Sequence, residues 1–279
     1  MKGVLERELA YHEKLYSGFA QAHFARPAVR ALRQHMVERI VAMTGVSAHS
    51  RVLSLGCGIG DTELLLAPRV AEVVGIDLSP NAVRQAQEDA ARLGIANARF
   101  QQGSTAEGRF DAVIAIFFLH HLADDALSGL PGTLASLLLP GGVFYSLDPS
   151  CRRASGAIGR IFVPHLMKRY QSPDERELEP EATADLFRRC GLEARVSIYD
   201  FGSSPLAGLF PGWRTGYRLA RGLDNLLLRV PVFRRYGSNF ELLARIRSDG
   251  GAGGSPPKCL DQDWAGELPA PPRQQNHPM

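Results

Sequence analysis

The sequence has few cysteines, no long apolar run and little net charge. Its four cysteines, Cys57, Cys151, Cys190 and Cys259, form no C-x-x-C pair and have no closely spaced histidines beside them, so they do not match a zinc site. Reduced thiols are therefore expected. No run of eighteen apolar residues occurs, and the charged amino terminus lacks the apolar region of a signal peptide. These absences predict a cytoplasmic protein with no membrane-spanning helix.

The charge balance argues against a nucleic-acid partner. The chain carries 32 Lys and Arg against 29 Asp and Glu, a net charge of +3. It also has no basic stripe interleaved with stacking aromatic residues, which nucleic-acid binders use. With 45% hydrophobic and 22% charged residues, the 279-residue chain has the composition of a globular protein with a sizeable core. We expect a small-molecule partner, no nucleic acid and no obligate protein partner.

The most informative stretch is the glycine turn, residues 51–60, with the sequence RVLSLGCGIG. An apolar strand ends there with Gly56, Gly58 and Gly60, and a second apolar strand ends about twenty residues later in Asp77. Glycine lets backbone N–H groups approach a ligand, and an aspartate can accept hydrogen bonds from two ribose hydroxyls. A dinucleotide site would need glycine instead of Asp61, whose carboxylate would face a pyrophosphate. The spacing favours a nucleoside ligand without phosphate at this turn, and S-adenosylmethionine (SAM) fits that description.

Short apolar strands alternate with helices along most of the chain, which predicts a doubly wound, mostly parallel α/β sheet. Seven strands are expected near 51–55, 72–77, 98–102, 110–117, 143–147, 193–199 and 239–246, and the last two could pair antiparallel. Helices are expected within 4–44, from 61, at 80–93, 124–138 and 180–190. We divide the chain into a helical cap (1–48), a ligand-binding core (49–150), the second half of the sheet with insertions (151–247) and a disordered Gly/Pro-rich tail (248–279).

Four motifs, in order and with the right spacing, resemble those of class I SAM-dependent methyltransferases, in particular the small-molecule "type 11" branch. They lie at 52–60, 74–79, 110–122 and 139–142. The resemblance implies a seven-stranded, Rossmann-like fold with a helical amino-terminal extension and an inserted lid. It also implies that the glycine turn lies against the methionine part of SAM, that Asp77 holds the ribose and that Leu78 packs on the adenine. The full set of implied cofactor-binding residues is Ser54, Gly56, Cys57, Gly58, Gly60, Asp77, Leu78, Ser104, Thr105 and Ile116.

Two positions depart from the family pattern. The family usually has an acidic residue at the position of Ser54 and often an aspartate at that of Ser104. Serine offers a hydroxyl without charge, and the loss at Ser54 is bounded by the ~1.5–3 kcal/mol of a hydrogen bond to a charged group. The alternative to an enzyme is therefore a non-catalytic SAM-binding or degenerate methyltransferase-like scaffold.

Three groups of residues are candidates for the acceptor side of the site. His120 and His121 follow the fourth strand at the carboxyl edge, where open α/β sheets bind ligands, so one of them could be a general base; capping or pocket lining is the alternative. Asp148 ends the fifth strand at the same edge and could position an acceptor hydroxyl or cap a turn. Tyr11 and Tyr16 belong to a leading helix that folds over the cofactor in similar enzymes.

The insertion at 201–237 is expected to set substrate identity. Phe210 and Trp213 are apolar candidates for a lid, and the helix after them has leucines at helical spacing on one face and arginines on the other. The favoured interpretation is a lid whose leucines pack on the domain, and the alternative is a face for an anionic membrane or a lipid-like substrate. An apolar lid without carboxylates favours methyl transfer to an oxygen or carbon nucleophile of a small, apolar metabolite. No metal site can be assembled from the region.

Overall fold

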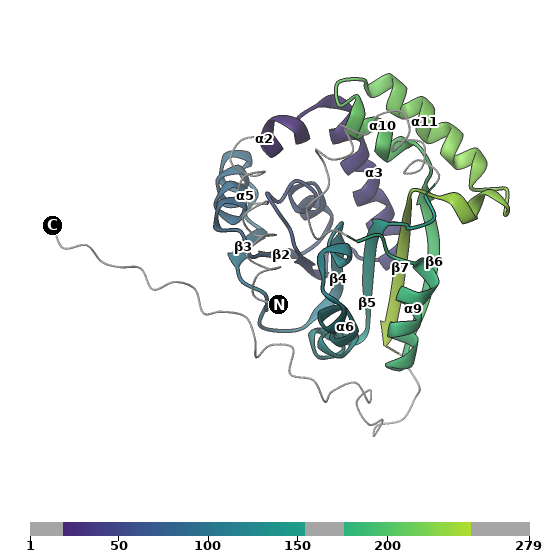
Figure 1. Ribbon diagram of the computed structural model, residues 1–279. Coiled ribbons are helices and arrows are strands. Elements are labelled where there is room, and N and C mark those ends of the chain that lie inside the picture. Colours follow the sequence, from purple (N-terminus) through teal and green to yellow (C-terminus); the bar gives the residue numbers. More distant parts are fainter. Residues whose placement is uncertain (1–18, 154–175, 247–279) are drawn as a thin grey trace.

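The computed structural model describes residues 19–153 and 176–246 (Figure 1). Tyr11, Tyr16, the 248–279 tail and most of the segment after Asp148 fall outside these ranges, so the predictions for them are not addressed by the structure. The two ranges contain a central sheet with helices on both faces.

The sheet has seven strands in the order β3-β2-β1-β4-β5-β7-β6. Their bounds are β1 Arg51–Leu55, β2 Glu72–Asp77, β3 Ala98–Gln102, β4 Phe110–Ile116, β5 Leu138–Pro149, β6 Leu192–Asp200 and β7 Asn239–Ile246. The first five pair in parallel, whereas β7 runs antiparallel to both β5 and β6. The predicted fold class is confirmed, including the antiparallel last pair. The strand order reverses between β1 and β4, which is where open α/β sheets bind ligands.

Helices form in every range where the sequence predicts one, and the insertion at 201–237 adds further helices. They are α2 Phe19–Phe24, α3 Pro27–Thr44, α4 Glu63–Leu66, α5 Pro80–Leu93, α6 Asp124–Leu137, α9 Pro180–Arg189, α10 Ser203–Leu209 and α11 Arg214–Leu227, with short 3-10 helices η1 Ala67–Arg69, η2 Leu119–His121 and η3 Phe233–Tyr236. In α5, Ser79 Oγ accepts the N–H of Ala82 at 3.0 Å, and Gly94 ends the helix with a φ of 67°. A serine is expected at the start of a helix and a left-handed glycine at its end, because each satisfies backbone groups that the helix leaves unpaired.

β5 begins five residues earlier than predicted. It starts at Leu138, and the expected turn at residues 140–142 lies inside the strand as an irregularity: Phe110 pairs with Leu138, but Ala112 pairs with Val143. Gly141 has a φ of 79° there. The turn chemistry was therefore interpreted correctly, but it makes a bulge in the strand and not the strand's start.

Two apolar clusters fill the two sides of the sheet. One joins Met36 of α3, Leu66 of α4 and Ala86 of α5 to strand residues such as Ile114. The other joins Leu130 of α6 and Phe187 of α9 to residues such as Val113, the neighbour of Ile114 on β4. Because alternate strand residues face opposite sides and both sides are covered, the inner strands are mostly apolar. This core fixes the carboxyl edge on which the candidate site lies.

The prediction that the leucines of the 201–237 insertion pack on the domain is wrong. On α11, Leu219, Leu223 and Leu226 are exposed, whereas Tyr217 and Asp224 are buried. The helix packs on α3 and α10 through this second face. Gly216 also lies on this buried face, and a Cβ there would overlap the ring of Trp213, the residue just before the helix.

Two further expectations can be compared with the described residues. Cys57 and Cys151 are free, but Cys190 is disulfide-bonded, so the expectation that all thiols are reduced is wrong for Cys190. None of the helices within residues 19–153 and 176–246 is long and apolar enough to cross a membrane.

Candidate functional site

The glycine turn follows β1 in the middle of the sheet. Gly56, Gly58 and Gly60 have φ values of 65°, 52° and 74°, which side chains with a Cβ rarely adopt. At Gly60, packing adds a second reason, since a Cβ there would lie 2.7 Å from the Phe100 ring. The backbone of this turn therefore requires glycine at all three positions before any ligand is considered.

Asp77 is oriented by the backbone of two loops. Its Oδ2 accepts the N–H of Gly58 at 2.8 Å and its Oδ1 accepts the N–H of Ser79 at 2.9 Å. The two bonds fix the carboxylate beside the glycine turn, where the predicted bonds to ribose hydroxyls are sterically reasonable. The ribose role itself stays a prediction.

Sequence reasoning missed Glu63. Ser54 Oγ donates a hydrogen bond to Glu63 Oε1 at 2.6 Å, and both side chains are buried. Burial raises the pKa of Glu63 to about 7, the bond from Ser54 opposes the rise, and the charge of Asp61 adds to it. Glu63 Oε2 has no hydrogen-bond partner among the described residues. A carboxyl group therefore lies beside Ser54, although β1 carries none.

One signal in the sequence could have revealed Glu63. It is the single charged residue between Thr62 and Ala67, in the run TELLLA. An acidic residue inside so short an apolar run is buried with the run, and buried carboxyls need a partner. The partner of Glu63 is Ser54, nine residues earlier on β1, and a motif search does not consider a pairing of this kind.

Arg33 holds α3 against the glycine turn. Its Nε lies 2.6 Å from Asp61 Oδ2, and its Nη1 donates to Thr62 Oγ1 at 3.2 Å. The guanidinium also lies over the rings of Phe24 and Phe117, 5.0 and 5.9 Å from their centroids. Asp61, which argued against a pyrophosphate ligand, therefore has a structural partner here.

Phe24 of α2 contacts the glycine turn. It packs with Ile59 of the glycine turn and with Ala82. Its neighbour His23 is half-buried, and burial lowers the pKa of His23, with the positive charges of Arg33 and Arg26 lowering it further. The residues Phe19–Phe24 of α2 therefore lie beside the glycine turn, and the expectation that the leading helix folds over the cofactor stays a prediction.

His120 and Asp148 form a buried pair at the carboxyl ends of β4 and β5. His120 Nδ1 lies 3.0 Å from Asp148 Oδ1, which also accepts the backbone N–H of His120 at 3.3 Å. His120 is 5% exposed and Asp148 is fully buried. We assign the proton to Nδ1, since an ionised carboxylate only accepts, and this makes Nε2 the basic nitrogen of the neutral ring. The arrangement matches the orienting carboxylate and general base of known catalytic dyads.

His121 is placed differently. Its ring lies 4.0 Å from that of His120, centroid to centroid, but it is half-buried. Just before the pair, Phe117 has a φ of 55°, a strained value for a residue that is not glycine. Backbone strain of this kind concentrates at functional sites. The structure therefore places the two predicted histidines in different surroundings, and the role of either as a base stays a prediction.

The other predicted cofactor residues gather around the same edge. The loop after β3 is joined to Asp77 by a bond from Gly103 N–H to the Asp77 carbonyl at 3.0 Å, which brings Ser104 and Thr105 to this side. Leu78 and Ser104 are half-buried, Thr105 is exposed, and Ile116 and Cys57 are buried. Burial raises the pKa of the Cys57 thiol well above its ordinary value, so we assign it a packing role.

Phe210 and Trp213 lie together but outside the core. Their rings are 6.2 Å apart, edge to face, and both are more than half exposed. The carbonyl of Pro211, between them, accepts the N–H of Ala28 at 2.8 Å, which joins this turn to the start of α3. Their role as acceptor-side residues stays a prediction.

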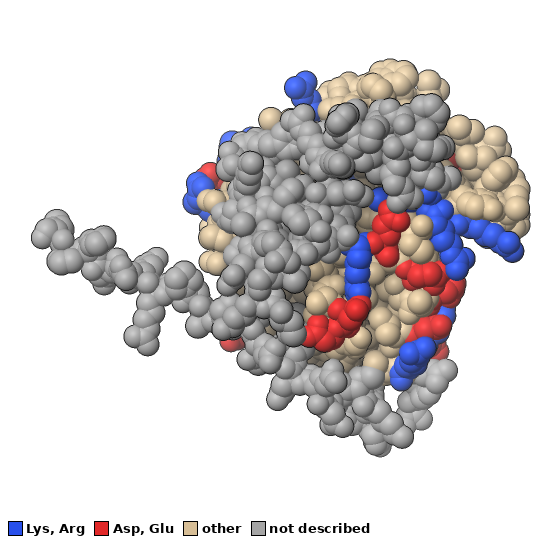
Figure 2. Space-filling model, in the orientation of Figure 1, with Lys and Arg blue, Asp and Glu red and all other residues tan. Residues whose placement is uncertain are grey.

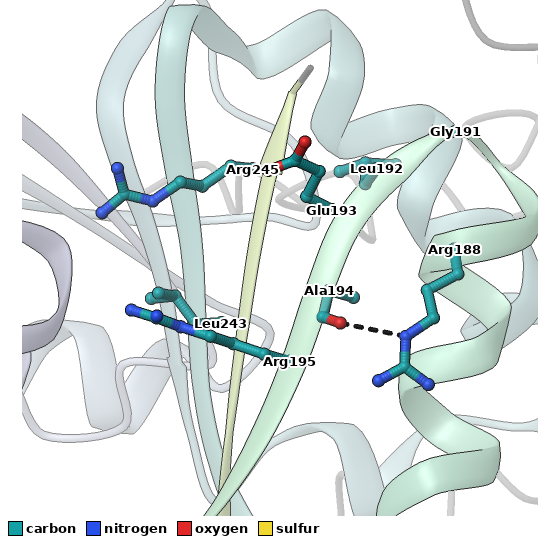
Figure 3. Close-up of a pocket in the computed structure, with 8 residues that line it drawn as sticks. All are labelled: Arg188, Gly191, Leu192, Glu193, Ala194, Arg195, Leu243 and Arg245. Carbon is teal, nitrogen blue, oxygen red and sulfur yellow. Dashed lines mark hydrogen bonds between the residues drawn. The ribbon is translucent and has the colours of Figure 1, made fainter. Parts of the chain in front are cut away.

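A hollow of about 750 Å³ lies elsewhere, at the start of β6 and the end of β7 (Figure 3). This is the end of the sheet opposite to the glycine turn, since Leu192 pairs with Ile246 there and Asp200 pairs with Asn239 at the carboxyl edge. Arg188, on its rim, already donates to the carbonyl of Ala194 at 2.9 Å. The hollow is remote from the predicted site, and it does not contain any of the residues that the motifs predict. Nor do the described residues contain a cluster of three metal-ligating side chains.

Comparison with known proteins identifies the part of the chain that carries the site. Residues 52–142, about a third of the chain, match the family model of a methyltransferase domain. Residues 52–142 carry a methyltransferase domain. The glycine turn, Asp77, Glu63 and His120 all belong to this methyltransferase domain.

Relatives share mainly this domain. The 23S rRNA (uracil(1939)-C(5))-methyltransferase RlmD of Shewanella sediminis is 41% identical over 70 residues, 25% of this chain and 16% of its own length. The uncharacterized methyltransferase YcgJ of Bacillus subtilis is 39% identical over 83 residues, 28% of this chain and 32% of its own length. The chain thus matches less than a third of either relative, and the methyltransferase domain says little about the acceptor.

Solved structures share the fold over a larger part of the chain. The structure of YcgJ aligns with a TM-score of 0.51 at 21% identity, covering 76% of this chain and 98% of YcgJ. A DhpI–SAH complex aligns with a TM-score of 0.58 at 18% identity, covering 89% of this chain and 99% of DhpI. At these identities the likeness extends to the fold and not to the substrate.

Proposed function

We propose that this protein transfers the methyl group of SAM to an oxygen or carbon nucleophile of a small, largely apolar metabolite. The observation that carries the proposal is the buried His120–Asp148 pair at the same sheet edge as the glycine turn and Asp77. A base near neutral pH suits the removal of a proton from a hydroxyl, an enol or a phenol. An ammonium acceptor would instead favour exposed carboxylates, and both Asp148 and Glu63 are buried.

The residues fit SAM as the cofactor. Gly58 and Asp77 would hold its methionine and ribose parts, Leu78 and Ile116 would contact its adenine, and the unpartnered Oε2 of Glu63 offers an acceptor behind the turn. When bound, SAM supplies an activated methyl group with its own leaving group. The protein has to align the acceptor behind that methyl group and exclude water.

His120 removes the acceptor proton in this proposal, and Asp148 is a positioning residue. By accepting the Nδ1 proton, Asp148 keeps Nε2 basic and stabilises the charge that the ring gains when it takes the acceptor proton. The backbone N–H of His120 donates to the same oxygen, so ring and backbone are held together. Such general-base catalysis contributes about 10²–10⁴-fold to a rate.

The test combines a binding and a transfer measurement. Calorimetric titration with SAM should give binding, and incubation of the protein and SAM with a cell extract should give a metabolite heavier by one methyl group in mass spectrometry. With that metabolite as acceptor, His120→Ala should lower kcat by about 10²-fold or more while SAM affinity is retained. His121→Ala is the matched control and should lose much less. Asp148→Asn should lower kcat with little change in KM.

Each failure has a distinct meaning. Absence of SAM binding at millimolar ligand would refute the enzyme and leave a degenerate scaffold. Binding without any methylated product would favour a non-catalytic SAM-binding protein. Equal losses in His120→Ala and His121→Ala would overturn the assignment of the base.

A further inference from the structure

Helix α11 presents an apolar stripe that the fold does not use. Leu219, Leu223 and Leu226 are 68%, 55% and 58% exposed, and Val230 continues the stripe just beyond the helix. Because successive helical residues are about 100° apart, this stripe lies roughly opposite the buried Tyr217 and Asp224. Its exposure is therefore a consequence of how the helix packs, and no internal contact among the described residues explains the leucines.

The stripe continues into η3. Val232, Phe233 and Tyr236 are also exposed in the segment that follows α11. Together with the α11 stripe they form what we term the apolar ridge: Leu219, Leu223, Leu226, Val230, Val232, Phe233 and Tyr236. In Figure 2 the part of this surface that is visible at the right edge is mostly uncharged, with blue basic side chains along its lower margin. Contiguous apolar surface of this kind marks an interaction site.

Cationic residues flank the ridge, and no exposed acid opposes them. Arg214 and Arg218 on the helix fall on one side of the stripe, and Arg229 follows just beyond the helix end. These three form no ion pair within the part of the chain that the structure describes, and neither does Arg235 of η3. The acid of the segment, Asp224, is buried and accepts the N–H groups of Gly202 and Ser203 at 3.1 and 2.9 Å. The exposed charges within residues 201–237 are thus all positive.

We propose that the apolar ridge and its arginines dock this protein on an anionic lipid bilayer. An interfacial helix places its apolar side chains among the acyl chains and its basic residues against anionic headgroups. A second copy of the chain fits less well, because a symmetric contact would bring the same arginines face to face.

The position of the ridge indicates which edge of the sheet would face the bilayer. α10, α11 and η3 connect the end of β6 to the start of β7, at Asp200 and Asn239, and these residues pair beside the end of β5. The ridge therefore belongs to the same edge of the sheet as His120 and the glycine turn. Docking would turn the carboxyl edge of the sheet toward the lipid. Membrane docking does not depend on methyl transfer, so the docking proposal and the proposed function can fail separately.

Co-sedimentation of the full chain with vesicles tests the proposal. Vesicles of phosphatidylcholine alone are compared with vesicles containing about 30% phosphatidylserine at low salt. We expect at least about tenfold stronger binding to the anionic vesicles, weakened by added salt. The double variant Leu223→Glu/Leu226→Glu should lose at least about tenfold of that binding, since each charge would have to enter the interface.

A matched control excludes a general effect of surface charge. Leu93 on α5 is 53% exposed and belongs to no ridge, so Leu93→Glu should bind as the wild type does. All these sites are exposed, and unchanged thermal unfolding would verify that the variants fold. Three results would overturn the proposal: wild type that stays in the supernatant with anionic vesicles, binding undiminished by the ridge variant, or a solution dimer that the ridge variant dissociates.

Discussion

The carboxyl of Glu63 leads to a specific prediction for the pH dependence of stability. Burial raises its pKa from 4.5 to about 7, so the native state retains a proton that the unfolded chain releases. Between these two pH values stability falls as pH rises, because the native state then binds more protons than the unfolded state. At about 1.36 kcal/mol per pKa unit, the loss reaches roughly 3 kcal/mol by pH 8.

The substitution Glu63→Gln removes this dependence. Glutamine cannot ionise, and its side-chain oxygen can accept the same hydrogen bond from Ser54 Oγ. We expect the variant and the wild type to unfold with similar free energies near pH 4.5, and the variant to be more stable by roughly 3 kcal/mol at pH 8. Denaturant unfolding followed by circular dichroism, repeated across this range, measures the difference.

The exposed Glu107 provides the control for Glu63. Glu107→Gln makes the same change of charge without the burial, and it should leave the pH profile of stability as in the wild type. If the difference in stability between Glu63→Gln and the wild type were the same at pH 4.5 and at pH 8, the pKa of Glu63 would not be raised by folding and the reasoning would be refuted. A variant less stable than the wild type at pH 8 would show that the native site requires the ionised carboxylate.

Three other predictions follow from the contacts. Arg39→Met removes the guanidinium that binds the buried Glu241 carboxylate at 2.9 Å, and it should lower the free energy of unfolding by about 3–5 kcal/mol in denaturant. The control Arg84→Met, at the surface, should lower it by less than about 1 kcal/mol. Gly45→Ala should cost about 1 kcal/mol in the same assay, because Gly45 has a φ of 76° and open space around it, so backbone strain is the whole effect. Asp77→Asn should weaken SAM binding about tenfold in calorimetry, since one charged acceptor is lost, and an unchanged affinity would exclude the ribose role.

Local patterns account for most of the fold that was predicted. Strands β1 and β2 have the predicted bounds, because short apolar runs that lie between turn residues are typical of buried strands. Helix α5 also has its predicted bounds, since Ser79, Pro80 and Gly94 each stop or start a helix by their own backbone chemistry. The start of β5 differs because the Pro-Gly-Gly turn can lie within a strand as a bulge, and only its pairing with β4 decides this.

The site was predicted in part. The glycine turn and Asp77 are close in sequence and joined by a motif, so their proximity could be inferred. His120 and Asp148 were separate candidates, 28 residues apart, and their pairing depends on β4 and β5 being neighbours. Glu63 was absent from the prediction, because its partner Ser54 lies on a strand and the bond depends on how α4 returns over it.

The sequence by itself determined where strands and helices form, that β1 ends in a turn only glycine allows, and that α11 has an apolar and a basic face. These follow from side-chain periodicity and backbone sterics, which act over a few residues. The tertiary structure alone decided which face of α11 turns inward, that Ser54 has a carboxyl beside it and that one of two histidines has an orienting aspartate. Those outcomes depend on which side chains pack between elements distant in sequence, and local patterns do not contain that information.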